Sequence, residues 1–166
     1  MILGMSLQTF TLLHVIISLI VIASGLIVLF GMLGSHRLAG WTGLFLLTTI
    51  LTSVTGFLFP VKGFTPALGT GIASLVVLAI ALLVLYGKHL DGSWRWIYVA
   101  TAVAALWFNV LVLIVQGFMK VASLHALAPN GNEPPFIVAQ AVAMVFFLVL
   151  GLIAAFKFRP GLRLSA

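Results

Sequence analysis

Apolar residues along the chain form five long runs, which short segments rich in polar residues, glycine or proline interrupt. Each run is long enough to cross about 30 Å of hydrocarbon at about 1.5 Å per helical residue. Backbone groups in lipid must bond within their own segment, so we expect each run to be a helix. The pattern predicts an all-α integral membrane bundle of five transmembrane helices, in one transmembrane domain over residues 1–166, with spans at about residues 7–33, 39–59, 68–86, 94–119 and 135–158.

The connections between the runs mark the expected bilayer surfaces. The first two runs are separated by "GSHRLAG", the next two by "PVKGFTP", and the third is followed by "GKHLDGS". The longest connection is "KVASLHALAPNGNEPP". The first run is too long for the apolar region of a signal peptide, and we expect it to be a retained span.

Composition agrees with a chain that lies in lipid. Hydrophobic residues make up 63% of it and charged residues 6%, whereas soluble proteins have about 25% charged residues. The net charge of +6 is spread along the chain without a basic patch, so we expect a bilayer partner and no nucleic acid. With no cysteine, the sequence offers no disulfide, thiolate nucleophile or iron–sulfur site.

The cations predict the direction of the spans. Lys62 and Lys120 fall on one side of the predicted bilayer, and the other Lys and Arg residues fall on the opposite side. Because Lys and Arg accumulate on the cytoplasmic side, we expect the N-terminus outside and the C-terminus inside. Aromatic residues expected at the cytoplasmic interface are Trp41, Trp94, Trp96 and Tyr98. The cytoplasmic cations are Arg37, Lys88, Arg95, Lys157, Arg159 and Arg163.

A layer of hydrogen-bonding side chains occurs at similar predicted depth in all five spans. At about 1.5 Å per residue, its members lie about 6–12 Å below the outer surface. Two interpretations stay open. The side chains can join helices to one another, at about 0.5–2 kcal/mol each, or they can anchor a lipid-like ligand such as a quinone head group, a lipid or a small hydrophobe. The members are His14, Thr52, Thr55, Ser74, Gln116 and Gln140.

Two further residues extend the candidate pocket. Asn109 shares a helical face with Gln116. Glu133 precedes two prolines at the mouth of the layer, where it either contacts a ligand or belongs to a turn with Asn130 and Gly131. The candidate ligand-binding residues are therefore His14, Thr52, Thr55, Asn109, Gln116, Gln140 and Glu133.

The histidines allow a different interpretation, b-type haem. His14 and His125 fall toward the predicted outside, and His36 and His89 toward the inside, which is the arrangement of a two-haem membrane cytochrome. Only His14 lies well within a predicted helix, and the other three, in or near connections, fit interfacial polar residues. No HxxxH pattern or His/carboxylate cluster occurs, and we expect no metal site.

The span interiors contain no Asp, Glu, Lys or Arg. This disfavours a proton pump, an ion-coupled transporter, and enzymes that need buried carboxylates or an activated nucleophile. Small residues at helical spacing, Ala100 with Ala104 and Gly151 with Ala155, indicate close helix contacts instead. We therefore expect no catalytic residue. The leading function is a non-enzymatic accessory subunit or a binder of a small hydrophobic ligand. The alternative is a haem- or quinone-linked electron carrier, and a small transporter is a third, less favoured class.

Three segments carry a resemblance to a known family: "TTILTSVTGFLFP", "WRWIYVATAVAALWFNVLVLIVQGFMKV" and "HALAPNGNEPPF". Together they resemble a family of small polytopic inner-membrane proteins of proteobacteria that has no assigned activity. An acidic-Pro-Pro-Phe segment before the last helix recurs in that family, and Glu133, Pro134, Pro135 and Phe136 match it. The resemblance implies a five-span fold in the bacterial cytoplasmic membrane, without a substrate or cofactor.

Overall fold

The computed structural model describes residues 2–60, 63, 65–90 and 92–159. Within these ranges the protein has five long apolar helices, each long enough to cross a membrane, which confirms the predicted all-α class. Helix α3 continues into a π-helical segment, η1, and a short helix, α5, lies in the long connection. The elements are α1 (Leu7–Leu33), α2 (Ala39–Phe57), α3 (Pro66–Leu82), η1 (Leu83–Gly87), α4 (Trp94–Lys120), α5 (Ala122–His125) and α6 (Pro134–Lys157).

Local chemistry accounts for where the helices begin. The Ser6 hydroxyl accepts a hydrogen bond from the Thr9 backbone N–H at 3.1 Å, and Thr65 accepts one from the Leu68 N–H at 3.2 Å. These side chains satisfy N–H groups that have no partner within the first helical turn. Helix α6 begins with two prolines, whose missing N–H groups cost nothing there.

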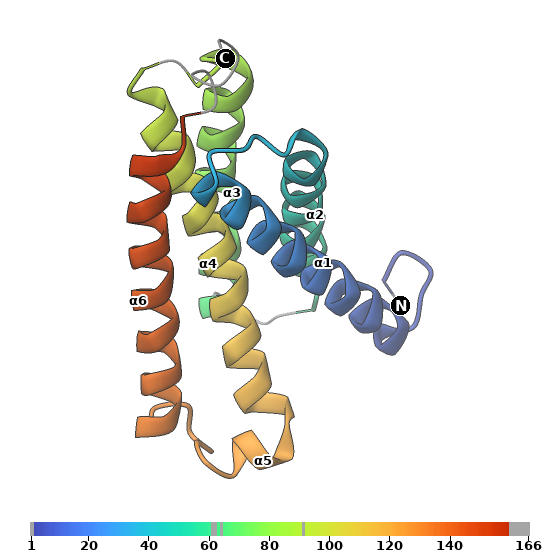
Figure 1. Ribbon diagram of the computed structural model, residues 1–166. Coiled ribbons are helices and arrows are strands. Elements are labelled where there is room, and N and C mark those ends of the chain that lie inside the picture. The colour runs from blue at the N-terminus through green and yellow to red at the C-terminus, as the bar shows by residue number, and fades with distance from the viewer. Residues whose placement is uncertain (1, 61–62, 64, 91, 160–166) are drawn as a thin grey trace.

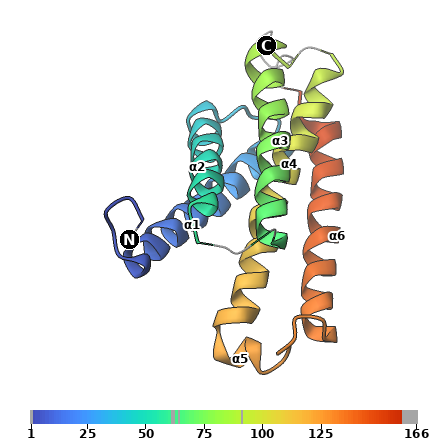
Figure 2. The ribbon, with the colours of Figure 1, turned by 180° about the vertical axis from the view of Figure 1, so that it is seen from behind.

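Helix α4 is the centre of the arrangement, since it contacts α1, α3 and α6. Helix α1 crosses the others obliquely, and its N-terminal end diverges from α4 and α6 (Figure 1). From behind, α3 runs between α2 and α6 (Figure 2). Helix α1 is about 40 Å long at about 1.5 Å per residue, longer than the hydrocarbon thickness, and a tilt accommodates such a helix.

The two ends of the bundle differ in charge. We call the end that carries Arg37, Lys88, Arg95, Lys157 and Arg159 the cationic end, and the opposite end, with α5, the α5 end. The buried apolar cluster lies in the cationic half. In α1 it runs from Val21 to Met32, and in α4 it ends at Leu106. The α5 half therefore holds few buried apolar side chains among the described residues, and Phe10 and Phe118 are two of them.

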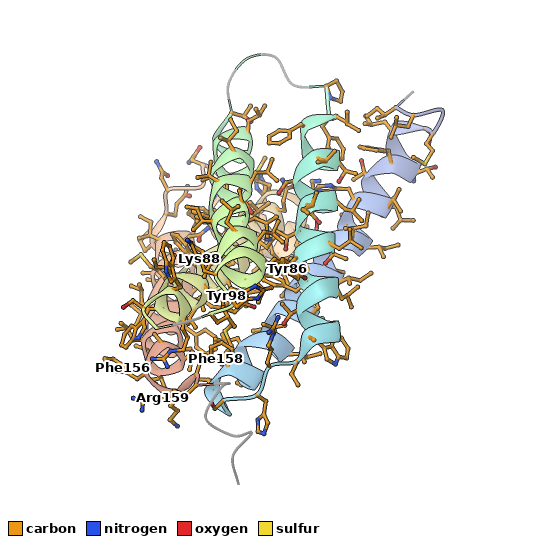
Figure 3. All side chains as sticks on the ribbon, turned by 90° about the horizontal axis from the view of Figure 1, so that it is seen from above. Tyr86, Lys88, Tyr98, Phe156, Phe158 and Arg159 are labelled. Atoms are coloured by element: carbon orange, nitrogen blue, oxygen red, sulfur yellow. The ribbon has the colours of Figure 1, made fainter. Side chains whose placement is uncertain are left out.

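Tyr98 corrects one expectation about the interface. It is only 2% exposed and packs against Phe158, with ring centroids 6.2 Å apart, instead of facing the membrane surface. The view from the cationic end shows Tyr98 and Phe158 toward the middle of the bundle and Phe156 at its edge (Figure 3). The burial of Phe158 ties the end of α6 to the core.

Candidate functional site

His14 and Thr55 join α1 to α2 in the α5 half of the bundle. The His14 Nδ1 and Thr55 Oγ1 atoms lie 2.8 Å apart. The Phe59 ring packs edge-on against the imidazole, with centroids 5.2 Å apart. These two members of the predicted polar layer thus meet directly, beside the Phe59 ring and away from the main apolar cluster.

The hydrogen bonds around Thr55 assign the tautomer of a neutral His14 ring. The Thr55 hydroxyl donates its single proton to the Leu51 carbonyl oxygen at 2.6 Å, and the Thr52 carbonyl lies at 3.2 Å. Since a carbonyl oxygen only accepts, Thr55 has no proton left for His14. Nδ1 of His14 must therefore donate to Thr55, which leaves Nε2 with an open lone pair.

Gln140 connects α6 to the backbone of α4. Its Nε2 donates to the Leu111 carbonyl oxygen at 3.3 Å. This contact fixes the orientation of the amide, because a flipped amide would set two acceptor oxygens against each other. Its Oε1 is buried and has no hydrogen-bond partner in the described part of the chain. The amide nitrogen therefore joins α6 to α4, whereas the amide oxygen lacks a hydrogen-bond donor among the described residues.

Three more oxygens of the predicted layer are buried and unpaired within the described ranges, in the same way as Gln140 Oε1. The Thr52 Oγ1, Ser74 Oγ and Gln116 Oε1 atoms are buried without a hydrogen-bond partner among the described residues. They lie on α2, α3 and α4, and α3 contacts both of its neighbours. Buried polar groups in proteins are nearly always bonded, so four such oxygens in one layer call for an explanation.

Other polar side chains in the spans bond to their own helix. Asn109 Nδ2 donates to the Ala105 carbonyl at 2.8 Å, so this candidate residue has a structural partner. Such bonds to the preceding turn satisfy a side chain without recruiting a ligand. The hydroxyls that do the same are those of Ser18, Ser24, Thr48, Thr49 and Thr101.

Glu133 belongs to the turn before α6. Its carboxylate accepts hydrogen bonds from the Asn130 backbone N–H at 3.0 Å, the Asn130 side chain at 2.8 Å and the Asn132 N–H at 3.1 Å. Partial desolvation raises the pKa of Glu133, but these donors outweigh it and hold the pKa below its ordinary value of 4.5. The carboxylate is therefore ionised and engaged by its own loop at neutral pH.

The four histidines lie on different elements and connections of the fold. His14 is the one within a spanning helix. His36 and His89 are exposed residues of connections, and His125 is exposed on α5, where its Nδ1 lies 3.2 Å from the Phe118 carbonyl oxygen. Ligation of haem between helices requires two facing imidazoles, so the haem alternative stays a prediction from sequence. No group of three His, Cys, Asp or Glu residues suited to a metal ion occurs among the residues that the structure describes.

A cavity that the sequence did not predict lies between α4 and α6. It has a volume of about 590 Å³ and contains none of the candidate ligand-binding residues. Ala100, Ala104, Gly151 and Ala155, which indicate close helix contacts in the sequence, line it. The Gly151 backbone does approach closely, since a Cβ there would lie 3.2 Å from Val103 Cγ1. Small residues thus both bring the helices together and leave space beside them.

The fold and the polar layer define a class, that of multi-pass α-helical integral membrane proteins. Comparisons with protein-family models, curated proteins and solved structures find no match for this chain. The resemblance to an inner-membrane family therefore remains an expectation from sequence, as do the membrane in which the protein resides and the direction of its spans.

Proposed function

We propose that this membrane protein binds a small lipid-like molecule in the α5 half of the bundle, through a head group that carries hydrogen-bond donors. The observation that carries the proposal is the set of four buried oxygens without a hydrogen-bond partner among the described residues: those of Thr52, Ser74, Gln116 and Gln140. Each belongs to a different helix, so one ligand that bonds to several of them would also join helices.

The chemistry of these oxygens limits the kinds of ligand that can bind to them. The amide oxygen of Gln140 accepts hydrogen bonds and cannot donate them, and the contact of the amide nitrogen with the Leu111 carbonyl keeps the amide from flipping. A ligand must therefore supply an O–H or N–H group at this point. The hydroxyls of a quinol or of a hydroxyl-bearing lipid meet this requirement, whereas the carbonyl groups of an oxidised quinone do not. The Nε2 lone pair of His14 would accept a further donor.

The surrounding structure supports a binding role over an enzymatic one. The described span interiors offer no ionised side chain, and Asn109 is bonded to its own helix. Few apolar side chains of this half are buried, and pockets between bundle helices commonly combine apolar walls with a few polar anchors.

Native mass spectrometry of the gently solubilised full chain tests the proposal. We expect a retained molecule with hydroxyl groups. Gln140→Leu and Gln116→Leu should each release it, because each removes an acceptor while preserving apolar volume. Thr101→Val is the matched control, since its hydroxyl bonds only the carbonyls of Ile97 and Tyr98 and lies in the cationic half. A chain that retains no such molecule, or variants that all retain it, would overturn the proposal.

A further inference from the structure

The cavity between α4 and α6 contains no residue of the polar layer and is lined mainly by apolar side chains. We name it the α4–α6 groove and define it by Trp96, Ala100, Ala104, Trp107, Gly151 and Leu152, which are among its lining residues. Its volume of about 590 Å³ is in the range of small-molecule sites in proteins. Helices α4 and α6 lie side by side along this region in both ribbon views (Figures 1 and 2).

The length of the groove corresponds to one leaflet of a bilayer. From Trp96 in the first turn of α4 to Trp107, the helix advances about 16 Å at about 1.5 Å per residue. That is about half of a hydrocarbon core of about 30 Å. The groove thus runs from the membrane surface at the cationic end to about the middle of the bilayer, which is the depth that one acyl chain occupies.

Positive charge flanks the surface end of the groove. The Trp96 and Phe156 rings are in edge-to-face contact, with centroids 4.7 Å apart. The contact shows that the adjacent ends of α4 and α6 meet here. Arg95 precedes Trp96 and Lys157 follows Phe156, so both cations belong to these ends. Arg95 is partly buried, and its Nε has no hydrogen-bond partner among the described residues. Arg95 and Lys157 do not line the groove, but they belong to the helix ends at its mouth and bring positive charge there.

Further cations lie at the same end of the bundle. Lys88 Nζ lies 5.2 Å from the centroid of the Trp94 ring, and the Arg159 backbone N–H donates to Ser35 Oγ at 2.8 Å. Lys88 and Arg159 are both visible at this end in Figure 3. The sequence contains two acids. Glu133 lies at the other end, and Asp91 lies outside the described residues. The net charge that the sequence assigns to this end remains strongly positive.

We propose that the α4–α6 groove binds an anionic phospholipid, with one acyl chain along the groove and the phosphate beside Arg95 and Lys157. Apolar walls of leaflet length exclude a polar solute, and the charge at the mouth distinguishes an anionic lipid from a zwitterionic one. Basic pockets between transmembrane helices are recognised sites for anionic head groups. Phosphate oxygens accept hydrogen bonds from guanidinium and ammonium groups.

The experiment compares lipids on the full-length chain. Native mass spectrometry in detergent, with added phosphatidylglycerol or phosphatidylcholine, should show phosphatidylglycerol retained at lower lipid concentration. The double variant Arg95→Gln/Lys157→Gln should lose this preference by about ten-fold or more, given the attraction of each cation for anionic lipid. Lys120→Gln, which removes an exposed charge at the α5 end, should leave it unchanged. Equal retention of the two lipids by the unmodified protein would overturn the proposal.

A second pair of variants tests the groove itself. Ala100→Leu fills part of the groove and should weaken retention of phosphatidylglycerol. Ala79→Leu adds the same volume at an exposed position on α3 and should not. A melting temperature close to that of the unmodified protein verifies that each variant is folded. If Ala100→Leu binds normally, the lipid lies on the charged surface and the groove assignment is wrong. If a dimer mass appears that Ala100→Leu abolishes, a second copy occupies the groove and the proposal also fails.

Discussion

The His14 imidazole and the Thr55 hydroxyl form a hydrogen bond of 2.8 Å between α1 and α2, across a sequence separation of 41 residues. The bond lies in the α5 half, away from the apolar cluster that holds the cationic half together. Side-chain hydrogen bonds have more influence on helix association where apolar contacts are few. This pair therefore contributes to the position of the diverging end of α1.

The first prediction concerns the protonation of His14. Because the Thr55 proton goes to the Leu51 carbonyl, we expect the neutral ring to carry its proton on Nδ1. Nitrogen NMR of the ¹⁵N-histidine-labelled protein in lipid distinguishes the two ring nitrogens by their chemical shifts. Thr55→Val should reduce the preference for this tautomer, because Nδ1 then loses its acceptor. A ring protonated on Nε2 in the unmodified protein would contradict the assignment.

The second prediction concerns the stability that the bond provides. Thr55→Val keeps the shape of the side chain and removes the hydroxyl, so we expect a loss of about 0.5–2 kcal/mol in the free energy of unfolding. Thr55→Ser keeps the hydroxyl and should lose less. Denaturant unfolding in mixed micelles measures the difference. Thr101→Val is the control, since its hydroxyl bonds its own helix alone. Equal losses for the two valine variants would show that the bond between helices contributes nothing.

The five spans could be predicted from sequence because they depend on partition into lipid, which long apolar runs determine without knowledge of tertiary contacts. The bounds agree closely, although α2 ends at Phe57 and not at residue 59. Helix α5 was not predicted, since four residues carry no readable periodicity. Segment η1 was not predicted either, because a π-helical turn arises from local adjustment of backbone hydrogen bonds and not from composition.

The polar residues could be recognised as a layer, but their partners could not be assigned. Whether Thr52 or Thr55 reaches His14 depends on the rotation and tilt of two helices, and neighbouring helical positions differ by about 100°. The sequence also could not predict that the apolar cluster lies in one half of the bundle, because all five runs are apolar throughout their length. The α4–α6 groove was not predicted for a related reason. A row of small residues indicates close contact between two helices, but the same small side chains can leave space next to the contact.

The third prediction concerns the pH dependence of the turn before α6. The pKa of Glu133 is lower in the folded protein than in the unfolded chain, so the carboxylate stabilises the turn above its unfolded pKa, and this contribution is lost as the pH falls through the folded pKa. We expect the amide resonances of Asn130 and Asn132 to titrate with a midpoint below 4.5. Glu133→Gln should abolish this titration. A midpoint above the ordinary value would contradict the hydrogen-bonding scheme.

The fourth prediction concerns the close packing around Gly25 in the core. A Cβ at Gly25 would lie 2.6 Å from Leu106 Cδ1 and 2.9 Å from Phe45 Cε2. Both side chains are 1% exposed, so neither can move without disturbing its neighbours. We expect Gly25→Ala to lower the free energy of unfolding by about 1–3 kcal/mol, the usual cost of overpacking.

Gly43 on α2 provides the matched control for Gly25, because a Cβ there would meet no atom within 4 Å. Gly43→Ala should be neutral or stabilise the protein by up to about 1 kcal/mol, since alanine loses less conformational freedom in a helix than glycine. Unfolding in mixed micelles compares the two variants under one condition. If Gly25→Ala were as stable as Gly43→Ala, α1 would have room to move away from α2 and α4. The contact at Gly25 would then not determine how α1 crosses the bundle.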